Sequence, residues 1–333
     1  MSHARSLLAA MLFTILSFPS AGIASPTSTD DWKTASPKAL GFNESLLNEG
    51  LEKAAALPYS HSLLVVRNGK IAAERYFHGY GVKSANNLKS ITKSVTSALI
   101  GIALEKRILK SIDEPVRAFF PDLFRELNDP RKDRITLRNL LNMSVGIDAN
   151  DELPGFDASE QLDQPRYVFT RPLIFDPGAM FSYTSAYTTI LSQILTDASK
   201  ISTRNFAQKH LFSPLGIEIM GWSKNAAGYY LGQSSLFLTT RNMAKFGLLF
   251  LSKGRFRGRQ VIPEKWVTHS TAPLIKASEG NGHYGYGWWV KAEAPVPFFY
   301  AWGYGGQYIY IVPSKNLIIV MTNDFSQRRP QID

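Results

Sequence analysis

The chain has 333 residues, and its 37 lysine and arginine residues outnumber its 27 aspartate and glutamate residues, which gives a formal net charge of +10. Hydrophobic residues make up 44% and charged residues 19% of the sequence, a globular composition that excludes a disordered, fibrous or polytopic membrane protein. The chain contains no cysteine, so disulfide scaffolds, cysteine zinc sites, iron–sulfur clusters and thiol nucleophiles are excluded.

The first 24 residues have the pattern of a secretory signal peptide. Arg5 precedes the apolar run 7–18, and Gly22 and Ala24 supply small residues at positions −3 and −1 of a cleavage site. The apolar run is too short to span a bilayer. We therefore expect a cleaved export signal at residues 1–24, a mature chain without stable membrane insertion, and a periplasmic or secreted location.

The next segments predict a lead-in, a helix and a hairpin. Residues 25–39 are rich in Ser, Thr and Pro and predict a flexible lead-in. Asn43 is a suitable N-cap for a helix that ends near Ala56. Asn68-Gly69 lies between the apolar runs 62–66 and 71–77 and predicts a β-hairpin, because both residues tolerate positive φ.

A long apolar helix is expected at 90–106, followed to about residue 221 by helices and loops. Strand patterns return after Tyr229, at 235–238, 284–290, 298–302, 307–312 and 317–322, and helices are expected at 240–252 and 263–270. The first hairpin pairs most simply with the late strands. The predicted fold class is α/β of the α+β type: an antiparallel sheet flanked by helices, at 40–88 and 226–333, with a helical subdomain inserted at 89–225.

Several common catalytic signatures are absent from the sequence. There is no G-x-S-x-G or H-E-x-x-H sequence, and the six histidines are scattered. Residues 280–285 match G-x-G-x-x-G, but they follow no predicted strand and open no helix, so a loop is expected there. No metal or organic cofactor is predicted.

Ser90 and Lys93 form the only S-x-x-K sequence, at the start of the long apolar helix. Residues i and i+3 share a helix face, so a desolvated, neutral lysine could take the proton of the serine hydroxyl. The N–H groups and dipole of the helix N-terminus favour a developing oxyanion. The structural alternative is a capping serine with an exposed lysine one turn on.

Two further segments suit the same chemistry. Tyr183 follows a Pro-Gly turn just before a predicted helix, where its hydroxyl could relay a proton to a leaving group; a core tyrosine is the alternative. Residues 303–306 are glycine-rich and precede the apolar strand that begins at Gln307. Glycines let a substrate approach a strand edge closely, although a plain hairpin turn has the same pattern.

The order of these elements resembles the serine β-lactamase and penicillin-recognising superfamily, in particular the class C-like serine hydrolases that include esterases and 6-aminohexanoate-dimer hydrolases. That family carries S-x-x-K, then Y-x-N or Y-x-S, then a K/H-T-G or glycine-rich motif. The corresponding stretches here are 90–93, 183–185 and 304–306, with supporting similarity at 135–146, 214–216, 239–247 and 284–289. The resemblance spans about residues 40–325 and implies a β-lactamase/transpeptidase-like fold.

The resemblance also implies roles for named residues. Ser90 would be the nucleophile of an acyl-enzyme, Lys93 its base and Tyr183 the proton relay. The N–H groups of Ser90 and Gln307 would form the oxyanion hole. The substrate pocket would be lined by Ser185, Tyr304, Gly305 and Gly306, with an apolar wall from Trp288, Trp289 and Trp302.

The sequence departs from the family pattern at three places. Ser185 replaces the usual Asn, and Tyr304 replaces a Lys or His that would pair with a β-lactam carboxylate. Both changes resemble the aminohexanoate-dimer hydrolase and esterase branch, so a small-molecule amide or ester substrate is expected. Only residues 325–333 follow the last predicted strand, and Pro330 disfavours the family's C-terminal helix there.

Other functions remain open from the sequence. Within enzymes, the alternative is a D-alanyl-D-alanine carboxypeptidase or a true β-lactamase. A catalytically silent binder of cell wall or polyanion is a second class. Nucleic-acid binding is suggested by the net charge and by Arg255, Arg257 and Arg259, but a solvated basic turn explains that stretch better, and no nucleic-acid partner is predicted. The sequence leaves the substrate and the oligomeric state undetermined.

Overall fold

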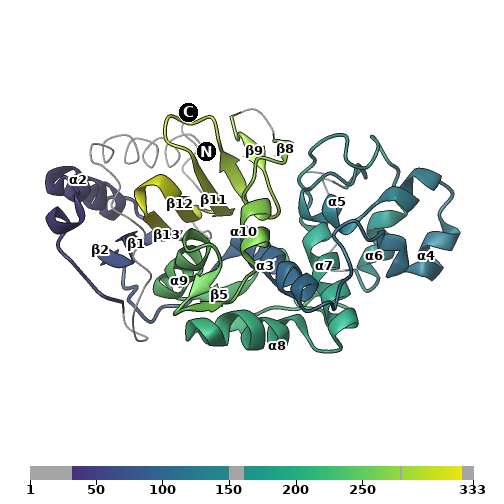
Figure 1. Cartoon of the computed structure of the whole chain (residues 1–333), viewed down its shortest axis with the longest axis horizontal. Coiled ribbons are helices and arrows are strands. Elements are labelled where there is room, and N and C mark those ends of the chain that lie inside the picture. Colours follow the sequence, from purple (N-terminus) through teal and green to yellow (C-terminus); the bar gives the residue numbers. More distant parts are fainter. Residues whose placement is uncertain (1–31, 150–160, 278–279, 325–333) are drawn as a thin grey trace.

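The computed structural model describes residues 32–149, 161–277 and 280–324. Its centre is an eight-stranded antiparallel sheet with the order β2-β1-β13-β12-β11-β10-β9-β8 (Figure 1). Since β1 pairs with β13, the predicted pairing of the first hairpin with the late strands is confirmed. The strands are β1 (Ser60–Arg67), β2 (Lys70–Tyr76), β8 (Ile275–Lys276), β9 (His283–Tyr284), β10 (Trp289–Lys291), β11 (Phe298–Gly303), β12 (Gln307–Val312) and β13 (Leu317–Asn323).

Helices pack on this sheet as the apolar patterns predict. Helix α2 (Glu44–Ala55) begins after Asn43, whose side chain accepts a hydrogen bond from Leu46 N, and it packs on β1. Helix α9 (Thr240–Leu251) packs across β1, β12 and β13. Gly247 lies at this crossing, where an added Cβ would be 3.0 Å from Ile309 Cγ2. Helix α10 (Glu264–Ser270) packs on α3 (Thr92–Glu105).

A helical part lies beside the sheet, with α3 between the two (Figure 1). It holds α4 (Pro121–Glu126), α5 (Leu137–Leu141), α6 (Gln164–Phe169), α7 (Ala186–Ser199) and α8 (Thr203–Ala207). The short helical turns are η1 (Lys38–Leu40), η2 (Lys89–Ile91), η3 (Val116–Ala118), η4 (Pro130–Arg134), η6 (Gln208–Phe212), η7 (Ser213–Leu215) and η8 (Pro313–Lys315). A small three-stranded sheet consists of β3 (Asn86–Asn87), β4 (Gly221–Trp222) and β5 (Leu236–Leu238). Strands β6 (Arg255–Phe256) and β7 (Arg259–Gln260) form a hairpin. We propose that the chain divides into domains as predicted, with the α/β sheet domain at 40–88 and 226–333 and the helical subdomain at 89–225.

Two predicted elements differ in the structure. The single strand expected at 284–290 is two short strands, β9 and β10, which pair with each other antiparallel. The chain reverses between them at two glycines. Gly285 packs so closely on the end of α10 that an added Cβ would lie 2.1 Å from Ser270 O, and Gly287 has a φ of 79°. The helix expected from residue 90 begins as the 3-10 turn η2, so Ser90 precedes the α-helix proper.

The two ends of the chain are described only in part. From Trp32, the predicted lead-in 25–39 runs along β2, where Ala35 N donates to Ile71 O at 3.1 Å and Ile71 N to Lys33 O at 2.9 Å. The predicted signal peptide at 1–24 and the C-terminal residues 325–333 lie outside the described residues. Within the described ranges, no helix has the length and apolar character needed to cross a membrane.

Glu74 on β2 and Arg241 on α9 form an ion pair that ties the first hairpin to the helix. Arg241 Nε lies 2.8 Å from Glu74 Oε1, and Arg241 Nη2 lies 2.6 Å from Glu74 Oε2. Burial raises the pKa of Glu74, but hydrogen bonds from Arg241 and Tyr76 bring it below the ordinary value of 4.5. We expect Glu74→Gln to lower the free energy of unfolding by about 2 kcal/mol at pH 7. The loss shrinks below pH 4.5, because protonation removes the same attraction from the wild type. Urea unfolding at pH 7 and pH 3.5 checks this; an equal loss at both pH values contradicts it.

Candidate active site

Ser90 and Lys93 lie at the junction of η2 and α3 with their side chains in contact. Lys93 Nζ is 2.8 Å from Ser90 Oγ, and the lysine side chain is only 1% exposed. Every residue of α3 from Thr92 to Ala103 is buried, because this helix lies between the sheet and the helical part. Lys93 is therefore buried and Ser90 lies partly buried beside it, so the alternative of an exposed lysine is wrong.

Lys93 Nζ has two further hydrogen-bond acceptors, Ser185 Oγ at 2.9 Å and Gln233 O at 3.3 Å. Ser185 is the N-cap of α7. The loop that carries Gln233 lies against this helix because residue 232 is glycine, whose added Cβ would be 2.0 Å from Thr188 O. Uncharged oxygens from three separate segments thus surround the amine.

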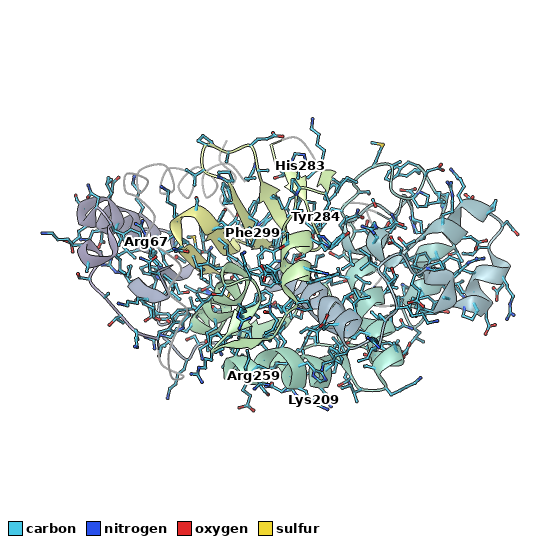
Figure 2. All side chains as sticks on the ribbon, in the orientation of Figure 1. Arg67, Lys209, Arg259, His283, Tyr284 and Phe299 are labelled. Carbon is cyan, nitrogen blue, oxygen red and sulfur yellow. The ribbon has the colours of Figure 1, made fainter. Side chains whose placement is uncertain are left out.

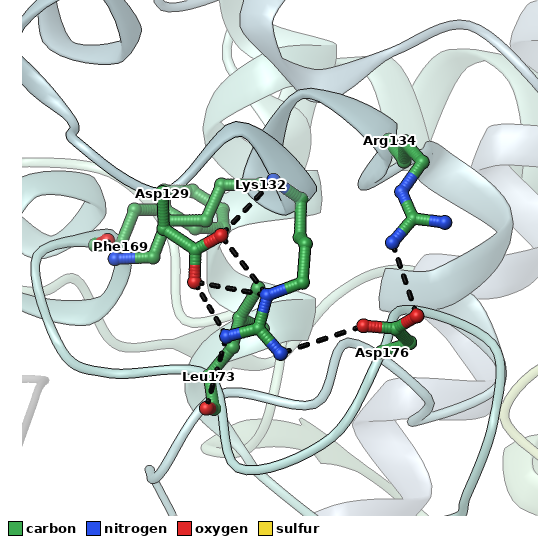
Figure 3. A network of polar contacts seen from close by, with 7 residues as sticks. Asp129, Lys132, Arg134, Phe169, Leu173 and Asp176 are labelled. Carbon is green, nitrogen blue, oxygen red and sulfur yellow. Dashed lines mark hydrogen bonds and ion pairs between the residues drawn. The ribbon is translucent and has the colours of Figure 1, made fainter.

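Tyr183 completes this group, with its ring centre 4.9 Å from Lys93 Nζ. The loop before it is fixed by an ion-pair network (Figure 3): Asp176 binds Arg131 at 3.4 Å and Arg134 at 3.1 Å. Further along, Ser182 N donates to Met143 O at 2.8 Å. These contacts hold the loop that leads to Tyr183 against η4 and against the segment that follows α5.

An aromatic wall continues from Tyr183. Its ring stacks on Trp289 at 5.8 Å, and Trp302 lies 6.0 Å from Trp289. Tyr284 lies edge-on to Tyr183 at 6.2 Å and deep in the structure (Figure 2), where burial raises the pKa of its hydroxyl well above 10 and the nearby Tyr183 adds to the shift. Tyr284 is therefore a neutral part of the wall.

Trp288 does not belong to this wall, and the expectation that it lines the pocket is wrong. It is fully buried and packs 4.5 Å from Phe250 of α9. Neighbouring residues of an extended chain point to opposite faces, so Trp289 contacts Tyr183 while Trp288 fills the core beneath α9.

The glycine-rich motif lies next to the Ser90 segment. An added Cβ at Gly303 would be 2.4 Å from Leu88 O, so the end of β11 rests directly on the backbone that leads to Ser90. Residues 304–306 form the turn into β12, and Gly305 and Gly306 have φ of 79° and 92°. Tyr304 is 67% exposed at the tip of this turn, whereas Gln307, the first residue of β12, is 1% exposed.

The site also contains residues that sequence reasoning missed. Lys89 has a φ of 49°, and its N–H donates to Asn87 Oδ1 at 2.9 Å, which turns the chain sharply before Ser90; burial lowers the pKa of the Lys89 amine. Gln233 takes part through its main-chain oxygen, for which no side-chain signal exists. Across the described residues, no group of three or more His, Asp or Glu could hold a metal ion.

The basic stretch that suggested nucleic-acid binding forms the β6–β7 hairpin. Arg255, Arg257 and Arg259 are all exposed on it, and Arg259 reaches the surface (Figure 2). Arg257 and Gly258 have φ of 48° and 77°, as a tight two-residue hairpin turn requires. The predicted solvated basic turn is confirmed.

Comparison with known proteins places this geometry in a family. The family profile described as Beta-lactamase matches residues 59–332. A 6-aminohexanoate-dimer hydrolase from Paenarthrobacter ureafaciens is 22% identical over an alignment of 296 residues that covers 81% of this chain and 74% of the relative.

Solved structures share the fold. A candidate β-lactamase from Bacteroides dorei superposes with a TM-score of 0.71 at 20% identity, over 89% of this chain and 92% of its own. A candidate 6-aminohexanoate-dimer hydrolase from Bacillus anthracis superposes with a TM-score of 0.69 at 21% identity, over 96% and 85%. The mixed fold with a large antiparallel sheet is therefore the β-lactamase/transpeptidase-like fold. Because the family profile matches most of its length, this chain belongs to the Beta-lactamase family of serine hydrolases.

Proposed function

We propose that this enzyme hydrolyses an ester or a linear amide through an acyl-enzyme on Ser90. The observation that supports this most is the 2.8 Å contact between Lys93 Nζ and Ser90 Oγ, made by a lysine that is 1% exposed. The three hydrogen-bond acceptors around Nζ are two hydroxyls and a backbone carbonyl. With no carboxylate in this described set, the amine is placed to take the proton of the serine hydroxyl.

In the acylation step, Ser90 Oγ attacks the substrate carbonyl carbon while its proton passes to Lys93 Nζ. The carbonyl oxygen becomes an oxyanion, which the N–H group of Ser90 would stabilise. The Gln307 N–H faces Gly303, its partner in the β11–β12 ladder, so Gln307 is left out of this step. The intermediate then collapses, the bond to the leaving amine or alcohol breaks, and Tyr183 passes a proton from Lys93 to that leaving group. Ser185 holds Lys93 through its 2.9 Å contact.

In the deacylation step, water attacks the ester formed on Ser90. The same Lys93 and Tyr183 pair accepts the proton of the water and returns one to Ser90 Oγ as the acyl group leaves as a carboxylic acid. The resting enzyme is thereby restored, and the sequence of steps consumes only substrate and water.

Tyr304 and Ser185 favour an ester or linear amide over a β-lactam. Tyr304 has no cationic group and is 67% exposed at the turn beside η2, so this position offers no cation to a substrate carboxylate. Ser185 is engaged with Lys93 and carries no amide group for substrate. The 6-aminohexanoate-dimer hydrolase among the relatives, named for a linear amide substrate, supports the same class.

The proposal is tested by labelling with a fluorophosphonate, which forms a covalent bond to an activated serine. We expect one equivalent to bind, peptide mapping to place it on Ser90, and Ser90→Ala to remain unlabelled. Turnover of esters, linear amides and a chromogenic cephalosporin is then compared. Label on another residue would disprove the Ser90 acyl-enzyme, and fastest turnover of the cephalosporin would replace the proposed substrate class by the β-lactamase alternative.

We further propose export of the chain, since residues 1–24 have the pattern of a signal peptide. The mature protein is expected to begin at Ser25. Intact-mass measurement of protein from the periplasm or medium of the expressing cells checks the cleavage site. A full-length mass in the cytosolic fraction alone would contradict export.

A further inference from the structure

A base of three buried aromatic rings supports the wall beside Tyr183. Trp289 is the centre of this base and is 5% exposed. The ring of Tyr284 meets it edge-on at 5.0 Å, and the ring of Tyr300 stacks on it at 6.3 Å. Both tyrosines are buried as well, so the three rings are held in place by close packing. The position of Trp289 is therefore fixed by the fold before a substrate binds.

Three further aromatic residues surround Trp289 and are only partly buried, and we call them the aromatic rim: Phe181, Tyr183 and Trp302. Their ring centres lie 5.9, 5.8 and 6.0 Å from that of Trp289. The rim joins two segments, because Phe181 and Tyr183 belong to the loop before α7 and Trp302 belongs to β11. Partly exposed rings on a rigid base offer flat apolar surface to a ligand at a low cost in conformational entropy.

Both ends of the aromatic rim lie at the nucleophile. At one end, the ring centre of Tyr183 is 4.9 Å from Lys93 Nζ, which is itself 2.8 Å from Ser90 Oγ. At the other end, Trp302 precedes Gly303, which lies against the backbone that leads to Ser90, and β11 packs on η2. The aromatic rim therefore borders the reacting atoms on the side of Tyr183.

The proton transfers indicate which part of the substrate meets this surface. In the proposed mechanism Tyr183 protonates the leaving amine or alcohol, so the leaving group must lie within hydrogen-bond reach of Tyr183. The two other members of the rim, Phe181 and Trp302, have no charged group, and neither has Tyr304 at the neighbouring turn. A charged leaving group would lose its hydration on these rings without gaining a partner, whereas an apolar one gains by burial.

We propose that the aromatic rim is the subsite for the leaving group and that it selects amines or alcohols that carry an aromatic or similarly flat apolar group. The inference rests on the proposed acyl-enzyme function of Ser90 and narrows its substrate class. Phe181 and Trp302 are specificity-determining residues: they contact the leaving group and take no part in proton transfer.

The test places the same phenyl group on either side of the scissile ester bond. 3-Phenylpropyl acetate is compared with propyl acetate, and ethyl 4-phenylbutanoate with ethyl butanoate. A chain of methylenes separates the phenyl group from the ester in both pairs, so the intrinsic reactivity of the bond is nearly unchanged. We expect the wild type to prefer 3-phenylpropyl over propyl acetate by at least about tenfold in kcat/KM. The gain from the phenyl group on the acyl side should be smaller by at least about threefold.

Trp302→Ala and Phe181→Ala should each reduce the preference for 3-phenylpropyl over propyl acetate to about threefold or less. Trp302→Phe keeps an aromatic ring and should retain most of the preference. The preference is a ratio of two kcat/KM values measured on one protein, so a loss of folded enzyme alone does not change it.

Trp32→Ala is the matched control. Trp32 is also a partly buried tryptophan, but it lies beside β2, and β1, β13 and β12 separate it from β11. This variant should keep the wild-type preference.

A wild-type preference near one would overturn the inference, as would an equal or larger gain from the phenyl group on the acyl side. An unchanged preference in both Trp302→Ala and Phe181→Ala would overturn it as well. Hydrolysis retained by Ser90→Ala would refute the proposed function and the inference with it. Hydrolysis abolished by Ser90→Ala, together with an unchanged preference in the two rim variants, would refute the inference alone.

Discussion

Ser90→Ala and Lys93→Met are each expected to lower kcat/KM for the preferred substrate by at least about 10³-fold. Methionine keeps the length of the buried lysine stem and removes the amine that lies 2.8 Å from Ser90 Oγ. If the two side chains work as one unit, the double variant should be no slower than the worse single variant, because either change alone already removes the activated nucleophile. Steady-state kinetics and the rate of fluorophosphonate labelling measure this.

Lys132→Met provides the matched control for the lysine. Lys132 is also buried, at 5% exposed, and its Nζ donates to a backbone carbonyl, Phe169 O, at 2.7 Å. It lies on η4, next to α6 and in the helical part away from the sheet (Figures 1 and 3). We expect this variant to lose stability but to keep kcat/KM within about threefold, since no reacting group touches it. Folded Lys93→Met protein with activity within tenfold of wild type would refute the role of Lys93 as the base.

The sequence predicted those parts of the fold that depend on local pattern. Asn68-Gly69 identified the β1–β2 hairpin, and the apolar run after Gly306 located β12 at the observed residues. The split of residues 284–290 into β9 and β10 could not be predicted from the sequence, because it depends on the close packing of Gly285 on Ser270 O. That contact exists only once α10 is in place.

The same limit applies to the site. The spacing of Ser90 and Lys93 is a side-chain pattern on one helix, and the structure brings the two together as that pattern predicts. Gln233 contributes a main-chain oxygen, which any residue possesses. The contact of Asn323 Nδ2 with Gly306 O joins residues 17 positions apart, and it depends on β13 lying next to β12. Sequence patterns on one element and the pairing of the first hairpin with the late strands were therefore predictable, whereas individual contacts between residues of neighbouring elements were not.

Gly101→Ala is expected to destabilise the protein by about 2 kcal/mol or more, although alanine in a helix interior ordinarily stabilises by about 1 kcal/mol relative to glycine. Gly101 lies on α3 where α10 crosses it, and an added Cβ would be 2.3 Å from Trp266 Cγ. Trp266 is 7% exposed and stacks on Tyr286 at 5.5 Å, so the indole ring has little room to move away. Urea unfolding of the purified variant measures the loss.

The origin of that loss can be separated from any intrinsic effect of alanine by making room for the methyl group. In a Trp266→Leu background the smaller side chain removes the collision, so Gly101→Ala should become neutral or stabilising, with a coupling energy of at least about 2 kcal/mol between the two positions.

Gly81→Ala is the control, because nothing lies within 4 Å of its added Cβ, and it should change stability by less than about 0.5 kcal/mol. Equal losses from Gly101→Ala in both backgrounds would mean that Trp266 is not what excludes a side chain there. Since α3 carries Lys93 and packs through residue 101 on α10, the expected coupling would show that this glycine sets how closely α3 approaches the segment leading to β8–β10.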